Sequence, residues 1–118
     1  MADNLELPSE WLRGVIEVCV LRVIADGPTY GYAIVGTLER SGLGTLKGGT
    51  LYPLLGRLEA AGWVNATWRE GDGGPGRKFY ELTSAGQIVL DSRRQQWIGF
   101  AATVSDLLGT EQNVERDA

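Results

Sequence analysis

Apolar residues in the first part of the chain recur at the three- and four-residue intervals of a helix. The first such stretch spans residues 9–25 and is ended by Asp26, Gly27 and Pro28. A surface helix needs one apolar stripe, whereas this stretch carries two: Leu12, Ile16, Cys19 and Val23, and Trp11, Val15 and Val18. The second stripe indicates that this helix is covered from two sides.

Two more helices are expected before residue 63. Residues 29–41 predict the second, with Tyr30 and Tyr32 in its first turn. The third begins between Gly49 and Tyr52, because Pro53 is tolerated in the first turn, where its missing N–H has no intrahelical partner. Its core face repeats at helical spacing and consists of Leu51, Leu54, Leu55 and Leu58.

From Trp63 onward, apolar and polar residues alternate with a period of two, which predicts strands. Residues 64–69 and 78–83 form a hairpin around residues 71–76, a glycine-rich segment expected to be an irregular loop. A last helix runs from Thr83–Ser84 to about Leu108. This order predicts an α+β, mainly α fold: a winged helix-turn-helix with a long C-terminal helix.

Composition excludes several classes of site. The single cysteine, Cys19, cannot form an intramolecular disulfide, and the absence of histidine removes zinc sites and the usual catalytic triads. No run of residues is apolar enough to span a bilayer, and the first residues lack a signal segment. We therefore expect a cytoplasmic, non-enzymatic protein without metal, cofactor or membrane contact.

The charge is uneven along the chain. The total is −4, yet residues 40–80 carry six basic and three acidic residues. A basic middle between acidic ends indicates a local anion-binding face, although an ordinary solvated surface would have a similar composition.

The glycine loop formally matches a dinucleotide-binding fingerprint at Gly71, Gly73 and Gly76, but that motif must open a helix, and here a strand follows. A wing is the better interpretation. Three cations flank the loop, Arg69, Arg77 and Lys78, as expected of a hairpin that reaches phosphates or a minor groove. An ordinary polar hairpin is the alternative.

The third helix has candidate DNA contacts on its outer side. Thr50, Pro53 and Arg57 point away from the leucines, with Tyr52 beside them. Arginine can bond guanine bidentately, and a threonine can contact bases or phosphate. The glycines at 48 and 49 leave the helix N-terminus open to a phosphate, and Lys47 adds charge there.

Three segments together resemble the PadR family of bacterial transcriptional regulators. They are Tyr30-Gly31-Tyr32, then Gly49-Thr50-Leu51-Tyr52-Pro53-Leu54-Leu55 with Arg57-Leu58-Glu59 and Gly62, then Gly73-Gly74-Pro75 with Arg77-Lys78, Tyr80, Leu82-Thr83 and Gly86. The single C-terminal helix is similar to the smaller subgroup, which includes multidrug-sensing members. The chain departs from the family at Gly49, where serine or another small polar residue is common, so that a contact there would come from the backbone.

The resemblance implies a homodimeric repressor that binds an inverted-repeat operator and is released by a small molecule. The predicted DNA contacts are Tyr30, Tyr32, Lys47, Gly49, Thr50, Tyr52, Arg57, Arg69, Arg77 and Lys78. A winged-helix protein–protein adaptor that does not bind DNA is the alternative function, but an adaptor would not need cations on both the third helix and the wing.

A seam on the last helix predicts self-association. Alternating steps of four and three residues connect Leu90, Arg94, Trp97, Ala101, Val104 and Leu108. Packing against the chain's own first helix is the alternative for part of this stripe. We expect a DNA-binding domain over residues 9–83, a dimerisation helix over 84–108 and a polar tail over 109–118.

Trp97 lies halfway along that helix, where a two-fold axis would bring it close to its symmetry mate. Two flat rings leave room for a planar aromatic guest, and the family's drug sensors carry a similarly placed tryptophan. The predicted effector site is Trp11, Val15, Trp97 and Phe100, with Ile98 as an alternative to Phe100. Trp97 filling the dimer core without any ligand is the competing interpretation.

Overall fold

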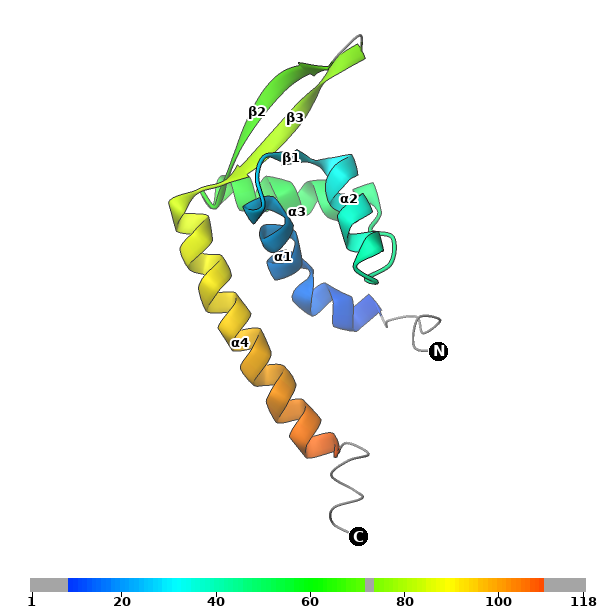
Figure 1. Cartoon of the computed structure of the whole chain (residues 1–118), viewed down its shortest axis with the longest axis vertical. Helices are drawn as coiled ribbons and strands as arrows, with labels where there is room; N and C mark the ends of the chain where they lie inside the picture. The colour runs from blue at the N-terminus through cyan, green and yellow to red at the C-terminus, as the bar shows by residue number, and fades with distance from the viewer. Residues whose placement is uncertain (1–8, 72–73, 110–118) are drawn as a thin grey trace.

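The structure is a computed structural model that describes residues 9–71 and 74–109, and it confirms the winged helix-turn-helix fold (Figure 1). Its elements in chain order are α1 (Ser9–Ala25), β1 (Thr29–Tyr30), α2 (Gly31–Arg40), α3 (Gly48–Ala60), β2 (Val64–Gly71), β3 (Gly74–Leu82) and α4 (Ser84–Leu108). The four helices and the hairpin match the sequence prediction, and β1 is an additional element.

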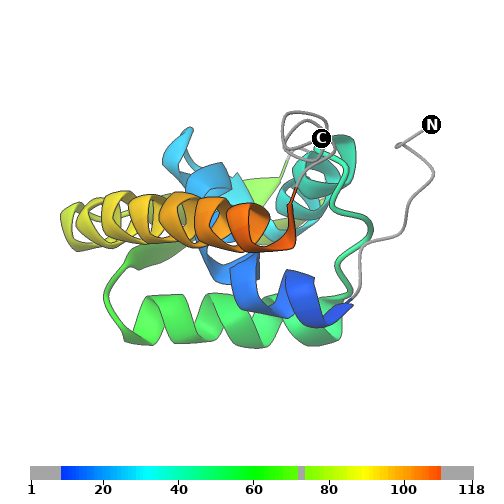
Figure 2. The ribbon, with the colours of Figure 1, turned by 90° about the horizontal axis from the view of Figure 1, so that it is seen from below.

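The core is formed by α1, α2, α3, the base of the sheet and Leu90 of α4, and seen from below α3 and α2 lie on opposite sides of α1 (Figure 2). All four predicted leucines of α3 are buried. In α1 the predicted stripe is wrong in detail: Val20, Leu21 and Ile24 are the fully buried residues, whereas Cys19 and Val23 are half-buried. Because α2, α3 and α4 all pack around α1, the buried positions do not follow one helical stripe.

The first turn predicted for the second helix is partly a strand. Thr29 and Tyr30 pair antiparallel with Tyr80 and Phe79, giving a three-stranded sheet of order β1-β3-β2. Tyr30 therefore caps α2 in an extended conformation, and Tyr32 alone of the two tyrosines lies in the first turn. The prediction failed because the hydrogen-bonding partner of this two-residue strand comes from a distant part of the sequence.

The wing is more regular than expected, since residues 74–76 belong to β3 and not to a loop. Gly71 pairs with Gly74, and the register shifts between Arg69 and Gly71. A Cβ on Gly76 would lie 3.0 Å from the Arg69 carbonyl oxygen, so glycine lets the strands approach closely here. The predicted loop residues 72 and 73 lie outside the described part of the chain.

The junction between the hairpin and α4 depends on Thr83. Its hydroxyl donates to the Gly62 carbonyl oxygen at 2.7 Å and accepts the Gly86 N–H at 3.0 Å, so that it caps α4 and ties the helix to the turn after α3. A Cβ on Gly86 would lie 2.0 Å from the Trp63 carbonyl oxygen, which excludes other residues at this contact.

Beyond this junction α4 extends away from the body of the domain, and the long axis of the molecule measures 63 Å (Figure 1). Leu90 is its last buried residue. An ion pair between Arg93 and Glu17 links α4 to α1. The helix ends at Leu108, followed by the C-cap Gly109, whose φ is +78°, and the rest of the predicted polar tail lies outside the described residues.

Thr83→Ala is expected to lower the free energy of unfolding by about 1–2 kcal/mol, because it removes the cap of α4 and the bond to Gly62 together. Thr83→Ser retains both hydrogen bonds and is the matched control. Chemical denaturation measures both, and equal stability of the alanine and serine variants would contradict this role.

Candidate nucleic-acid interface

The N-terminal end of α3 is open to solvent. Its N-cap residue, Lys47, makes no side-chain capping bond, and the carbonyl oxygen of Lys47 accepts the N–H groups of Thr50 and Leu51. Lys47, Gly48, Gly49 and Thr50 are all exposed. Uncapped N–H groups and the helix dipole favour an anion at this end, and the lysine adds a full positive charge.

The exposed face of α3 has small residues along its centre. With the leucines facing the core, helical spacing places Gly49, Pro53, Gly56 and Ala60 on the opposite side, and all four are exposed. Larger residues occupy the flanks of this strip, Thr50 and Arg57 on one side and Tyr52 and Glu59 on the other. Such a surface allows the helix backbone to come close to a groove.

Arg57 lies toward α1 and α4. It lines a hollow of about 380 Å³ that it shares with Arg13, Arg93, Trp97 and Phe100. Arg57 was predicted together with Thr50 as an outward contact, and both lie on the flank that faces away from the wing. The structure therefore brings Arg57 near the predicted effector residues as well as near the exposed face of α3.

On the other flank, Tyr52 packs closely on the start of α2. A Cβ on Gly31 would lie 2.5 Å from the Tyr52 hydroxyl oxygen, so the glycine between the two tyrosines of the motif makes room for this ring. Tyr32 points to solvent and is 81% exposed. Tyr30 is half-buried on the sheet, which separates the two tyrosines that the sequence analysis had grouped.

Glu59 connects this flank to the wing. Its carboxylate accepts a hydrogen bond from Lys78 Nζ at 3.2 Å in a partly exposed ion pair. Burial raises the pKa of the nearby Tyr80 hydroxyl, Lys78 opposes this rise, and Glu59 and Tyr52 add to it. Lys78, predicted as a phosphate contact, thus already has an acidic partner in the free protein.

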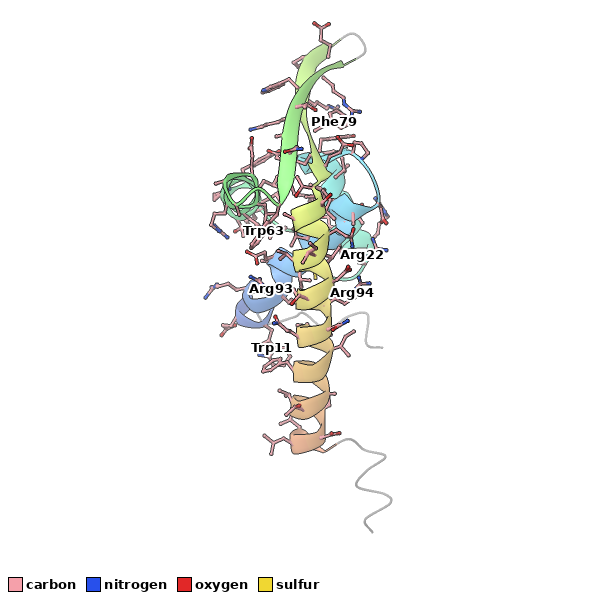
Figure 3. All side chains as sticks on the ribbon, turned by 90° about the vertical axis from the view of Figure 1, so that its left-hand side faces the viewer. Trp11, Arg22, Trp63, Phe79, Arg93 and Arg94 are labelled. Atoms are coloured by element: carbon pink, nitrogen blue, oxygen red, sulfur yellow. The ribbon has the colours of Figure 1, made fainter. Side chains whose placement is uncertain are left out.

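The wing arginines are exposed and stacked on aromatic rings. The Arg69 guanidinium lies 4.5 Å from the centre of the Phe79 ring, and the Arg77 guanidinium lies 4.5 Å from the centre of the Tyr30 ring. Phe79, labelled on the wing in Figure 3, was missed by the sequence analysis. The available signal was its position in the alternation of β3, which places an aromatic ring on the face opposite the buried Tyr80.

The predicted effector residues are only partly brought together. Trp97, 46% exposed, lines the hollow beside Arg57 and also a second, almost entirely apolar hollow of about 390 Å³ on the α2 side of α1. Val15 lines the second hollow and Phe100 the first. Trp11 is 70% exposed and lines neither (Figure 3).

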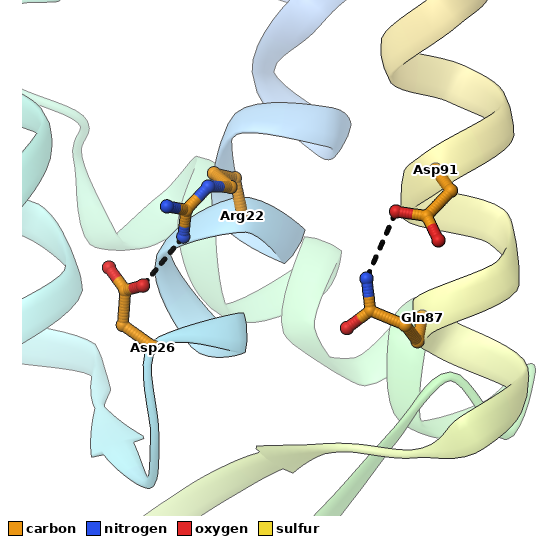
Figure 4. Close-up of polar contacts among 4 residues, drawn as sticks. All are labelled: Arg22, Asp26, Gln87 and Asp91. Atoms are coloured by element: carbon orange, nitrogen blue, oxygen red, sulfur yellow. Dashed lines mark hydrogen bonds and ion pairs between the residues drawn. The ribbon is translucent and has the colours of Figure 1, made fainter.

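The apolar hollow contains Cys19 and has its polar groups at the rim. Burial raises the pKa of the Cys19 thiol, which therefore stays protonated at neutral pH. Two arginines line the hollow at its rim: Arg22, which pairs with Asp26 at 2.7 Å, and Arg94, which pairs with Asp91. Asp91 also accepts a hydrogen bond from Gln87, and Figure 4 shows this bond and the Arg22–Asp26 pair. The Asp91 carboxylate thus has two partners on its own helix.

The chain itself buries the start of the predicted dimerisation seam and covers the rest only in part. Leu90 is 2% exposed and packs in the core of its own chain, so it offers no surface to a partner. Trp97 and Leu108 are exposed, and Ala101 and Val104 are half-buried. None of the helices in the described ranges is both long and apolar enough to cross a membrane, and those ranges hold no cluster of metal ligands.

Residues 20–92 match the Transcriptional regulator PadR-like family. The chain is 35% identical over 86 residues to the transcriptional regulator Rv3488 of Mycobacterium tuberculosis, a match covering 73% of this chain and 78% of that protein. The fold is similar to the crystal structure of a PadR family regulator from Eggerthella lenta, with 36% identity, a TM-score of 0.74 and coverage of 89% and 88%. A PadR-like regulator from Bacillus cereus gives 33% identity, a TM-score of 0.76 and coverage of 86% and 99%.

Glu59→Gln is expected to tighten binding to duplex DNA by up to about fivefold, because it releases Lys78 from an exposed ion pair of about 0.2–1 kcal/mol. Fluorescence anisotropy with a labelled duplex measures the change. Glu81→Gln is the charge-matched control, since Glu81 forms no ion pair within the described ranges. An equal gain in DNA affinity in Glu59→Gln and Glu81→Gln would assign the effect to net charge alone.

Proposed function

The chain belongs to the PadR-like family of transcriptional regulators, and on this basis we propose that it represses transcription as a homodimer bound to an inverted-repeat operator. The observation that carries the proposal is the exposed face of α3. Its uncapped N-terminus, its strip of small residues and the cationic wing are the features that a helix inserted in a major groove requires.

Local charge supports DNA as the partner of a chain whose net charge is −4. Lys47 at the start of α3 and Arg69 and Arg77 on the wing are exposed, so that phosphates can be contacted on both sides of the inserted helix. Thr50 and Arg57 on one flank, and Tyr52 on the other, are the side chains proposed to reach base edges. An adaptor without DNA binding would have no use for this arrangement.

The uncovered part of α4 supports a homodimer. Apolar residues follow one another beyond Leu90 where the chain's own core no longer reaches: Trp97, Ile98, Phe100, Leu107 and Leu108 are all exposed. Exposed apolar surface of this extent is costly in water, and a second copy of α4 and of Trp11 on α1 would cover it. A two-fold axis between the copies would also match the symmetry of an inverted repeat.

The position of Trp97 supports regulation by a small planar effector of the kind sensed by the smaller subgroup of the family. Its ring borders both hollows beside α1, and each is large enough for a flat aromatic molecule. Arg57 and Trp97 both line the hollow of about 380 Å³, so a guest bound there would contact α3 and α4 at once, whereas the apolar hollow has no α3 residue in its lining. Displacement of α3 by this guest is the proposed route to release of the operator.

The DNA-binding role is tested with Lys47→Ala and Arg57→Ala. Loss of the phosphate contact of Lys47 is expected to weaken binding to operator and random duplexes alike. It is also expected to reduce the slope of log affinity against log salt concentration by about one. Loss of a base contact at Arg57 is expected to cost about 1–3 kcal/mol on the operator and much less on random DNA.

Electrophoretic mobility shift with the DNA upstream of the chain's own gene identifies the operator for these measurements. Arg40→Ala is a matched control, because Arg40 is the last residue of α2, hydrogen-bonds Thr37 and is not one of the proposed DNA contacts. If neither Lys47→Ala nor Arg57→Ala changes the affinity for any duplex, the DNA-binding proposal is wrong and the adaptor function is favoured.

The effector role is tested with Trp97→Ala. Planar aromatic compounds are expected to quench tryptophan fluorescence saturably in the wild type but not in this variant, while the dimer mass by light scattering is retained, because the remaining seam stays apolar. Trp11→Ala controls for quenching at an exposed tryptophan outside both hollows. Dissociation of the Trp97 variant into monomers, with no ligand binding by the wild type, would assign Trp97 to the dimer core.

A further inference from the structure

The outer face of the sheet carries a cluster of two arginines and two aromatic rings. Val64 and Tyr80 are buried on the inner face, so the alternation of the strands puts Arg69, Arg77 and Phe79 on the outer face. Tyr30 lies directly opposite Phe79 in the ladder and therefore shares that face. The two rings are tilted by 60° with their centres 5.2 Å apart.

Arg69 and Arg77 are also direct partners across the two strands of the wing. Two like charges in this position repel each other and destabilise the hairpin. Within the described residues, the ion pairs engage Arg22, Lys78, Arg93 and Arg94 and neither of these two arginines. An anion held between the two guanidinium groups would turn their repulsion into a shared attraction.

The aromatic rings give this pair a defined shape. Each guanidinium lies over one ring at 4.5 Å, Arg69 over Phe79 and Arg77 over Tyr30. Stacking occupies the flat face of a guanidinium and leaves its N–H edge available to phosphate oxygens. It also restricts the side chains before binding, which lowers the entropy lost when the anion is bound.

We propose that Phe79 and Tyr30 are positioning residues that hold Arg69 and Arg77 as one paired site for a phosphate of the DNA backbone. This inference rests on the proposed DNA-binding function. It assigns the wing a preformed phosphate site in place of independent flexible cations, and it gives Phe79 a role in binding although its ring need not contact DNA.

The test is a double-mutant cycle between Phe79→Leu and Arg69→Ala, with affinities for a fluorescein-labelled duplex of mixed sequence measured by anisotropy at low salt. Phe79→Leu keeps an apolar side chain but removes the ring. It is expected to weaken binding about two- to fivefold in the wild type, the range for an exposed cation–π contact. In the Arg69→Ala background the same change is expected to have no further effect.

Three comparisons separate positioning from a merely structural role. Phe79→Tyr keeps a ring under Arg69 and is expected to restore wild-type affinity. Combined with Lys78→Ala, which changes the opposite face of the same strand, Phe79→Leu is expected to keep its full effect. Tyr30→Leu paired with Arg77→Ala repeats the cycle at the second ring, so the result does not depend on one variant folding.

Each outcome has one interpretation. If Phe79→Leu lowers the DNA affinity equally with and without Arg69, the inference is overturned and Phe79 acts through the stability of the sheet. Thermal unfolding would then show a lower Tm for Phe79→Leu. An unchanged affinity in Phe79→Leu, with Arg69→Ala weaker than wild type, would overturn the inference and leave the proposed function intact. Failure of the wild type to bind any duplex would reject the proposed function itself.

Discussion

Burial of the leucine face of α3 is the constraint on which the other features of the interface depend. Four leucines of one helix are packed in the core, and each contributes about 1.5–3 kcal/mol relative to exposure. Rotation of α3 about its axis would expose some of them, so the helix has a single orientation. That orientation turns Gly49, Pro53, Gly56 and Ala60 outward, directs Arg57 toward α1 and α4, and directs Glu59 toward the wing.

The two flanks of α3 are therefore in different physical environments. On the wing side, the Glu59–Lys78 ion pair and the packing of Tyr52 on Gly31 connect α3 to β3 and α2. On the other side, Arg57 is exposed and borders a hollow. In the proposed function, this asymmetry holds α3 firmly on the wing side, while Arg57 on the other side remains accessible to the region around Trp97.

The start of α4 divides that helix into two parts with different energetics. Thr83 and Gly86 fix its first turn against the turn after α3, and Leu90 completes the core. Beyond Leu90 the helix carries large apolar side chains that the domain does not cover. A helix of this kind gains most of its stability from packing an apolar face, which is the physical basis for proposing a second copy of the chain as its partner.

The sequence by itself determined the helices, the hairpin, the leucine face of α3 and the start of the last helix at Thr83–Ser84, because each depends on periodicity or on chemistry within a few residues. It also identified the cations of the wing. Only the tertiary structure decided which groups those cations meet: Glu59 for Lys78, and the rings of Phe79 and Tyr30 for the two arginines. It likewise decided that Thr29 and Tyr30 form a strand, that Leu90 belongs to the chain's own core, and that Arg57 and Trp97 share a hollow. These features join residues that are distant in sequence, and local propensity carries no information about such contacts.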